Sequence, residues 1–209
     1  MDFRRPLEAV TPTLDGDVLR VLARADTDMT GRQIQRLTGH GSHQGIRNAA
    51  DRLTQQGVVA RRSVGNAHLY RLNREHVAAH WIEGLASLPE QIVERLRNLV
   101  ETWAQPPLLA MLFGSVATGQ ATPDSDLDLL IVRPGGCDPD APAWREQIAT
   151  LEANATAWTG NDARVMEYGE DELKRGKIKP LLQDALRDGI ELHGSPRPLR
   201  RRERAGSPR

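Results

Sequence analysis

The chain has 209 residues, 39% of them hydrophobic, and its 28 basic and 28 acidic residues leave no net charge. The single Cys137 cannot form an intramolecular disulfide, which indicates a reducing compartment. The first residues lack the apolar core of a secretion signal, and no apolar run approaches the roughly 18 residues that span a bilayer. We therefore expect a soluble, cytoplasmic protein with no membrane partner.

Charge is unevenly distributed along the chain. Basic and acidic residues number 12 and 8 in residues 1–75, 10 and 19 in residues 76–193, and 6 and 1 in residues 194–209. Such asymmetry indicates separate modules with different partners. We expect four parts, at residues 1–75, 76–106, 107–194 and 195–209. The last part is rich in Pro and Arg with almost no apolar residues, which predicts a disordered basic tail.

Three helices are predicted in the first part. Apolar residues recur at helical spacing over residues 14–25. Thr30 is a candidate N-cap for a short second helix that ends at Gly39. A third helix follows the candidate cap Ser42 and ends at Gly57, and its inward stripe is apolar.

A two-stranded ribbon is predicted after the helices. Residues 58–64 and 67–73 have strand character on either side of a tight turn at Gly65-Asn66. Three helices followed by such a ribbon resemble the winged helix-turn-helix family over residues 12–74. The resemblance implies duplex DNA as a partner.

The outward face of the third helix and the ribbon carry side chains suited to base edges and phosphates. The candidate DNA-binding residues are Ser42, His43, Gln44, Arg47, Asn48, Arg52, Arg61 and Arg62. Between Asp28 and Arg74 there are 8 Arg against 2 Asp, which favours DNA binding. A domain that only packs against a protein partner is the other interpretation.

Residues 76–106 are expected to form a helical connector. Val77, Trp81 and Leu85 recur at helical spacing, and Pro89 opens a second helix at a favoured first position. The second helix either packs on the next domain or forms a homodimer contact, because winged DNA binders commonly pair on two half-sites.

Small and acidic residues lie between two apolar runs in the third part. The run at residues 107–113 predicts a strand buried on both faces. Gly114-Ser115, directly after it, allows phosphate oxygens to approach the backbone. Asp126 and Asp128 then open a second strand and share one face, where two carboxylates repel unless a cation such as Mg²⁺ lies between them. The pattern predicts metal-assisted phosphoryl or nucleotidyl transfer.

The same stretch resembles the signature of nucleotidyltransferases of the DNA polymerase beta superfamily, which reads Gly-Ser, a further Gly, then Ser-Asp-x-Asp-Leu. The resemblance covers about residues 90–194 and implies a small mixed sheet with helices on one side. The implied nucleotide-binding residues are Gly114, Ser115, Gly119 and Ser125. The resemblance further implies two Mg²⁺ ions on catalytic Asp126 and Asp128, and a third carboxylate on a later strand. Glu167 is the candidate for this catalytic and metal-binding role, unless it is an exposed strand charge.

Together these observations predict an α/β (α+β) fold class, with an N-terminal winged helix-turn-helix domain and a C-terminal polymerase-beta-like domain. The leading hypothesis is a DNA-binding transferase that moves a nucleoside monophosphate from an NTP, expected to be ATP, to a protein or small molecule. The family resemblance adds a toxin as one protein acceptor, with repression of a shared toxin–antitoxin operon through the DNA-binding domain. The alternative is a transcriptional regulator whose transferase domain only senses nucleotide. A nuclease or structural module is disfavoured, because a nuclease needs no triphosphate cradle.

Overall fold

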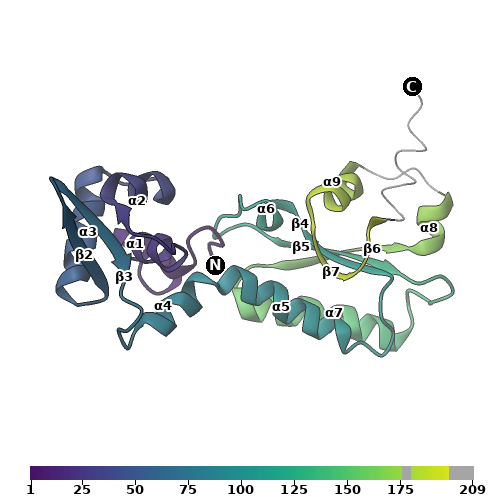
Figure 1. Cartoon of the computed structure of the whole chain (residues 1–209). Helices are drawn as coiled ribbons and strands as arrows, with labels where there is room; N and C mark the ends of the chain where they lie inside the picture. The colour runs from purple at the N-terminus through teal and green to yellow at the C-terminus, as the bar shows by residue number, and fades with distance from the viewer. Residues whose placement is uncertain (176–179, 198–209) are drawn as a thin grey trace, which may run out of the picture. The chain divides into compact units, whose positions relative to one another are not determined.

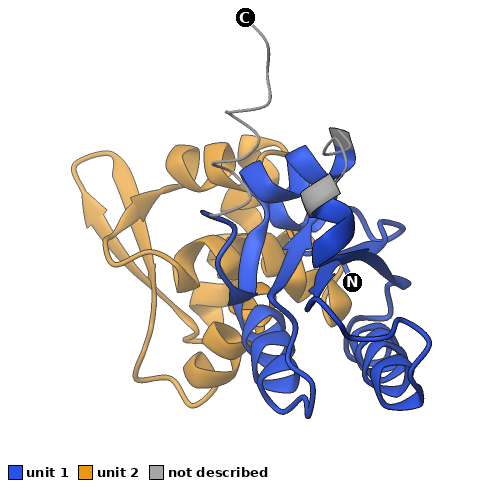
Figure 2. Ribbon diagram, turned by 90° about the vertical axis from the view of Figure 1, so that its right-hand side faces the viewer, with its two compact units in different colours: residues 1, 3, 90–209 blue, residues 2, 4–89 orange. Residues whose placement is uncertain are grey.

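The computed structural model describes residues 1–175 and 180–197, and the chain divides into two compact units (Figure 2). The N-terminal unit comprises Asp2 and residues 4–89, and the C-terminal unit comprises Met1, Phe3 and the described residues from 90 onward. The predicted tail lies outside the described residues from position 198. No helix in the described part of the chain has the length and apolar character needed to cross a membrane.

The N-terminal unit has the predicted winged helix-turn-helix order. Its elements are η1 (Pro6–Ala9), α1 (Leu14–Ala23), β1 (Met29–Thr30), α2 (Gly31–Thr38), α3 (His43–Gln55), β2 (Val59–Val64), β3 (Ala67–Leu72) and α4 (Ala79–Ala86). The strands pair antiparallel in the order β1-β3-β2. The hairpin of β2 and β3 is the wing (Figure 1).

Polar caps determine where α2 and α3 begin. Thr30 Oγ1 accepts a hydrogen bond from Gln33 N, and the Gln33 side chain accepts one from Thr30 N, which forms a capping box. Ser42 Oγ accepts a hydrogen bond of 3.0 Å from Gly45 N. Gly39 ends α2 with φ +77°, a conformation that favours glycine. The predicted caps are therefore confirmed.

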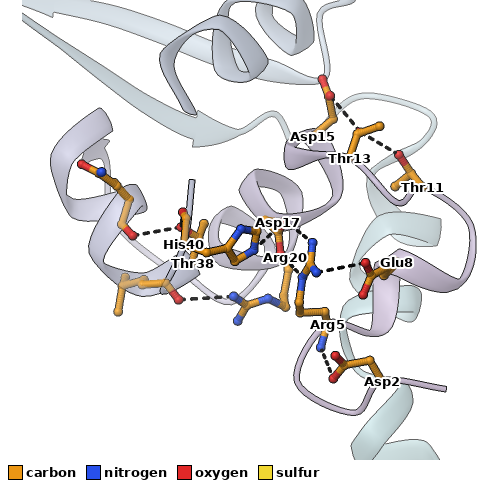
Figure 3. Close-up of polar contacts among 12 residues, drawn as sticks. Asp2, Arg5, Glu8, Thr11, Thr13, Asp15, Asp17, Arg20, Thr38 and His40 are labelled. Carbon is orange, nitrogen blue, oxygen red and sulfur yellow. Dashed lines mark hydrogen bonds and ion pairs between the residues drawn. The ribbon is translucent and has the colours of Figure 1, made fainter. Parts of the chain in front are cut away.

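Asp17 of α1, a buried carboxylate, connects Arg5, directly before η1, to the loop between α2 and α3 (Figure 3). Its side chain is 2% exposed and accepts hydrogen bonds from Arg5 Nε at 3.0 Å and Nη2 at 2.9 Å. His40 Nε2 lies 3.1 Å from Asp17 Oδ2, and Arg5 also contacts Glu8 at 2.9 Å. Because a buried carboxylate without partners is strongly destabilising, these contacts hold the start of the unit together.

The expected connector is not a separate part, because its two helices belong to different cores. The buried residues are Ala79, Ile82 and Ala86 in α4, and Ile92, Leu96 and Val100 in α5 (Leu88–Glu101). The α4 residues lie in the core of the N-terminal unit and the α5 residues in the core of the C-terminal unit. The units divide after Pro89, so the structure places the boundary inside the expected connector.

Two of the three residues in the apolar stripe predicted for this region face outward, whereas the third, Leu85, packs half-buried against the core. Val77 and Trp81 are 88% and 70% exposed, and the ring of His80 lies edge-on to Trp81 at 5.2 Å. Ile82 and Ala86 form the buried stripe instead. Several apolar residues follow one another here, so helical spacing alone could not select the inward face.

The C-terminal unit is built on a four-stranded mixed sheet, as predicted. After α5 its elements are β4 (Leu109–Phe113), α6 (Gly114–Ala117), β5 (Leu127–Arg133), α7 (Pro142–Thr159), β6 (Ala163–Gly169), α8 (Glu170–Arg175), α9 (Pro180–Asp188) and β7 (Ile190–Gly194). The strand order is β6-β5-β4-β7. The β5–β6 pair is parallel and the other two pairs are antiparallel.

Helices cover both faces of this sheet, which corrects the expectation of helices on one side. Leu129 and Ile131 of β5 pack in the same cluster as α5 and α7. Leu130 and Val132 pack on the other face, with α9 (Figure 1). Because successive strand residues alternate between faces, two apolar faces require two covering layers.

Candidate active site and nucleic-acid interface

Gly114 lies directly beside the carboxylate of Asp128. Phe113, the last residue of β4, pairs with Asp128 of β5, so the chain turns into α6 next to this side chain. Gly114 has φ +73°, and a Cβ built on it would lie 2.5 Å from Asp128 Oδ2. Glycine is therefore required here for conformation and for space. The structure thus brings Gly114 and Asp128 together.

Asp126 is part of the same acidic edge and is held by an arginine. Arg164 Nη1 lies 2.7 Å from Asp126 Oδ2, and Arg164 Nε donates a hydrogen bond of 3.1 Å to Asp162 Oδ2. Arg164 also pairs in register with Asp128 across the parallel β5–β6 ladder. One guanidinium thus lies among the carboxylates at this end of the sheet.

The two predicted metal-binding aspartates influence each other. Burial raises the pKa of Asp128 above its usual 3.8, and the negative charge of Asp126 raises it further. Arg164 lowers that pKa, but by less. Ionisation of Asp128 is thus less favourable in the folded protein than in water, and a cation beside it would stabilise the ionised form.

Of the other predicted nucleotide-binding residues, Ser115 lies in α6, and Gly119 and Ser125 lie in the loop between α6 and β5. Gly119 follows Thr118, the C-cap of α6, with φ +68° and an open space where a Cβ would be. Ser115 contributes its carbonyl to a hydrogen bond from Gln120 N. Ser125 Oγ accepts a hydrogen bond of 2.9 Å from Thr122 N, so its hydroxyl braces the loop.

Glu167 lies on the opposite face of the sheet from Asp128. Since Arg164 is the register partner of Asp128, strand alternation places Glu167 on the other face. The donors to its carboxylate are Arg133 Nε at 2.8 Å, Trp144 Nε1 at 3.0 Å, and Arg145. The prediction that Glu167 faces the aspartates does not agree with this register, and its contacts are those of a residue that joins β5, β6 and α7.

The environment of Glu167 stabilises its charged form. Burial alone raises the pKa of this carboxyl, but hydrogen bonds from Arg133, then Arg145 and Trp144, outweigh it. The pKa of Glu167 therefore lies below its usual 4.5.

A divalent cation fits the aspartate edge together with ligands from a substrate. Among the described residues, no group of three or more His, Cys, Asp and Glu side chains is arranged to hold a metal. Mg²⁺ is usually bound through one or two carboxylates with phosphates and water. Asp126 and Asp128 satisfy this, and glycine at position 114 lets the backbone pass directly beside the Asp128 carboxylate. The residues present fit one such ion and do not fit the predicted pair of ions.

Two residues at this edge were not predicted from the sequence. Arg164 was missed because only the register of the parallel strands reveals its position beside Asp128. Asn161 is 2% exposed, and its Nδ2 donates to the carbonyls of Pro123 and Ser125. It thereby positions the loop that leads into Asp126. In the sequence, the position of Asn161 directly after Gly160, which ends α7, was the feature that could have indicated this role.

The predicted DNA-binding face is exposed, but its arginines are paired within the unit. The ion pairs are Arg52–Asp15 at 2.7 Å, Arg62–Asp28 at 2.9 Å, Arg61–Asp51 at 3.1 Å and Arg47–Asp51 at 3.9 Å. Gln44 Nε2 donates to Asn48 Oδ1 at 2.7 Å. Ser42 is used as the cap of α3, and His43 opens that helix. Phosphates would have to replace these internal partners.

A hollow of about 280 Å³ lies between α2, the start of α3 and the wing. Basic side chains in its lining are Arg32, His43, Arg47 and His68. Arg32 and Arg36 of α2 are exposed, and they were missed because only the third helix and the wing were considered. The hollow places predicted and unpredicted basic residues on one surface.

Three comparisons with known proteins bear on these two sites. No curated protein matches the chain. A solved structure of a toxin–antitoxin with AMP-PNP is 18% identical and aligns over 54% of this chain and 82% of the other, with a TM-score of 0.39. A mutant of the toxin–antitoxin MntA-HpeT is 17% identical, with the same coverage and TM-score. A candidate nucleotidyltransferase from Sulfolobus solfataricus is 18% identical over 50% of this chain and 82% of the other, with a TM-score of 0.31. These likenesses are too weak to assign an activity.

Two family models match the chain, one for each predicted domain. A family model described as MarR family matches residues 10–68, which span the helices and most of the wing. A family model described as nucleotidyltransferase domain matches residues 90–195, half of the chain, including Gly114 and both aspartates. The chain therefore belongs to the nucleotidyltransferase domain family, with a MarR-family winged-helix domain preceding that domain.

Proposed function

We propose that the C-terminal unit binds a nucleoside triphosphate and one divalent cation at the edge formed by Gly114, Asp126 and Asp128, and transfers the nucleoside monophosphate to an acceptor. The contact between Gly114 and Asp128 carries this proposal. Gly114 has a left-handed backbone conformation and no room for a Cβ, and it lies beside Asp128, a carboxylate whose pKa is raised. That is the arrangement expected where phosphate and cation meet.

Each residue has a separate part in this proposal. Asp126 and Asp128 hold the cation, which when bound neutralises phosphate charge. Gly114 brings the backbone directly beside the Asp128 carboxylate, where a larger residue would displace it, and Ser115 follows it at the phosphate end. Asn161 fixes the loop before Asp126 through two hydrogen bonds, so that the carboxylates are positioned before substrate arrives.

The N-terminal unit, in the same proposal, binds duplex DNA through α3, the wing and the basic hollow beside them. Exposed Arg32 and Arg47 contact phosphates or base edges. A homodimer would place two wings on two half-sites. The combination of a DNA-binding domain with a transferase supports a regulator that represses its own operon and modifies a partner protein, in the manner of an antitoxin acting on a toxin.

The second candidate function is a regulator that senses nucleotide without transferring it. Arg164 favours this candidate, because it occupies the register position beside Asp128 and pairs with Asp126. A guanidinium there balances charge but cannot accept a proton from an attacking hydroxyl. Nucleotide binding is common to both candidates, and transfer distinguishes them.

Nucleotide binding is tested with a matched pair of glycine substitutions. Gly114→Ala and Gly136→Ala both place alanine at a positive φ, +73° and +78°, but only the former meets the Asp128 carboxylate. We expect Gly114→Ala to lower the affinity for ATP in Mg²⁺ by at least about tenfold, and Gly136→Ala to retain most of it. Isothermal titration of the full chain measures both. Equal loss in the two variants would contradict the assignment of the site.

Transfer is tested with ATP, GTP, CTP and UTP labelled in the α-phosphate, using cell lysate as the source of acceptors. A labelled product that disappears in Asp128→Asn identifies the transferase. Nucleotide binding without any labelled product supports the sensor.

DNA binding is tested by titrating the full chain with DNA from upstream of its own gene and with a scrambled duplex. Arg47→Ala should weaken binding and reduce the log–log salt slope by about 0.9 for each phosphate that Arg47 neutralises in the parent. Arg187→Ala, an exposed arginine of α9 in the other unit, is the control. Absence of binding to both duplexes at low salt would assign the winged domain to protein contacts.

A further inference from the structure

The position beside Asp128 on β6 is occupied by a cation that belongs to the chain. Arg164 is the register partner of Asp128 and lies on the same face of the sheet. Its Nη1 is 2.7 Å from Asp126 Oδ2 and its Nε is 3.1 Å from Asp162 Oδ2. The guanidinium therefore bridges two carboxylates and lies near a third.

A second divalent ion would need a ligand at this position. Two metal ions in such sites lie about 3.5–4 Å apart and share carboxylates and phosphates between them. Glu167, the acidic residue of β6, is directed to the opposite face and is bound by Arg133 and Trp144. Arg164 repels a second cation and already balances the negative charge that such an ion would balance.

The chemistry of the guanidinium also suits a triphosphate. Its planar donors match carboxylate and phosphate oxygens, and it stays charged at every physiological pH. The Arg164 side chain is 62% exposed, so it is free to exchange a carboxylate partner for a phosphate. Asp126, its partner, is 34% exposed and reachable from solvent.

We propose that Arg164 takes the place of a second metal ion, so that the site binds a nucleoside triphosphate with one divalent cation and this guanidinium. The inference rests on the proposed nucleotide site and extends it. In the free protein Arg164 neutralises Asp126 and competes with the cation. In the nucleotide complex it contacts phosphate oxygens and releases Asp126 to the cation.

The number of cations is the first test. Mn²⁺ is titrated into the full chain with a saturating non-hydrolysable ATP analogue, and free Mn²⁺ is counted by electron paramagnetic resonance. One ion per bound nucleotide is expected. Two ions per bound nucleotide would overturn the inference and leave the nucleotide site intact. A chain that binds no nucleotide would overturn the proposed function together with the inference, so the two failures are distinguishable.

The second test removes the charge of Arg164. Arg164→Gln should bind Mn²⁺ about tenfold more tightly without nucleotide, because the competing charge is gone. The same variant should bind the nucleotide analogue about tenfold more weakly in saturating Mg²⁺, because one phosphate partner is removed. A residue that only stabilises the strand end would not move the two affinities in opposite directions.

Arg187→Gln is the matched control. Arg187 is 67% exposed and, like Arg164, pairs with two carboxylates, Asp184 and Asp188, but on α9. It should leave both affinities unchanged. If Arg164→Gln behaves as Arg187→Gln in either titration, the inference is wrong. Melting temperatures of both variants establish that the compared proteins are folded.

Discussion

Replacing Glu167 by glutamine should destabilise the C-terminal unit rather than disable a catalytic group. The Glu167 side chain is 17% exposed and its partner Arg133 is 11% exposed, so this pair is poorly screened by solvent. Hydrogen bonds to charged groups contribute about 1.5–3 kcal/mol each, whereas the bond to Arg145, which is 46% exposed, contributes little. Glutamine keeps one acceptor oxygen but turns an amide donor toward other donors. We expect a loss of about 2–3 kcal/mol, which lowers the melting temperature by about 10–20 °C.

The loss should depend on pH with a definite sign. The pKa of Glu167 is lowered below 4.5 in the folded protein, so its ionised form stabilises the fold above that pH. That stabilisation disappears as pH falls through the lowered pKa, because the protonated side chain resembles glutamine. The parent and Glu167→Gln should therefore differ most near pH 7 and converge in acid.

Thermal unfolding followed by near-ultraviolet circular dichroism measures the difference, because the rings of Trp103 and Trp144 lie edge-on at 5.5 Å in the same core. Glu191→Gln, at an exposed position of β7, is the control, since Arg97 contacts the backbone carbonyl of Glu191 and not its side chain. An unchanged melting temperature for Glu167→Gln, with nucleotide transfer abolished, would refute the structural role assigned here.

Two further substitutions test the charges of Asp128 and of the buried Asp17. Asp128→Asn should abolish cation binding and raise the melting temperature at pH 7, because the raised pKa of Asp128 means that its negative charge opposes folding. The gain in melting temperature should vanish as pH falls through that pKa toward 3.8. A lower melting temperature of the variant at pH 7 would contradict this reasoning. Arg5→Met should lower the free energy of unfolding by about 2–3 kcal/mol in a denaturant titration, because the buried Asp17 would keep His40 as its partner but lose Arg5. Arg4→Met, at a residue 49% exposed, is the control and should lower it by less than about 1 kcal/mol.

Local patterns predicted most of the fold. Continuous apolar runs predicted β4 and β5, and polar caps predicted α2 and α3, because each of these signals depends on neighbours within a few residues. The pairing of β5 with β6 depends on register instead, and a slip of one residue exchanges the faces of a strand. Local sequence therefore predicted that β6 is a strand, but could not select Arg164 over Glu167 as the neighbour of Asp128.

In the winged domain, too, local sequence predicted the elements but not the contacts between residues far apart in the chain. The order of helices and hairpin follows from local spacing, and the exposed face of α3 follows from its apolar stripe. The acidic partners of its arginines do not follow, since Asp15 and Arg52 are 37 positions apart and meet through the packing of α1 against α3. A basic face predicted from sequence is thus less positive in the folded domain than the count of arginines indicates.

The positions of Arg164 beside Asp128 and of Glu167 on the opposite face of the sheet limit how this site could transfer a nucleotide. Glu167 is used to join β5, β6 and α7, and Arg164 cannot accept a proton at physiological pH. Proton removal from an acceptor hydroxyl would have to fall to Asp126 or Asp128, each of which is also proposed to hold the cation. An acceptor that arrives already ionised would avoid this conflict, and a nucleotide sensor would not meet it. The residues proposed to bind nucleotide are therefore compatible with both candidate functions, and the constraint created by Arg164 applies to the transfer step alone.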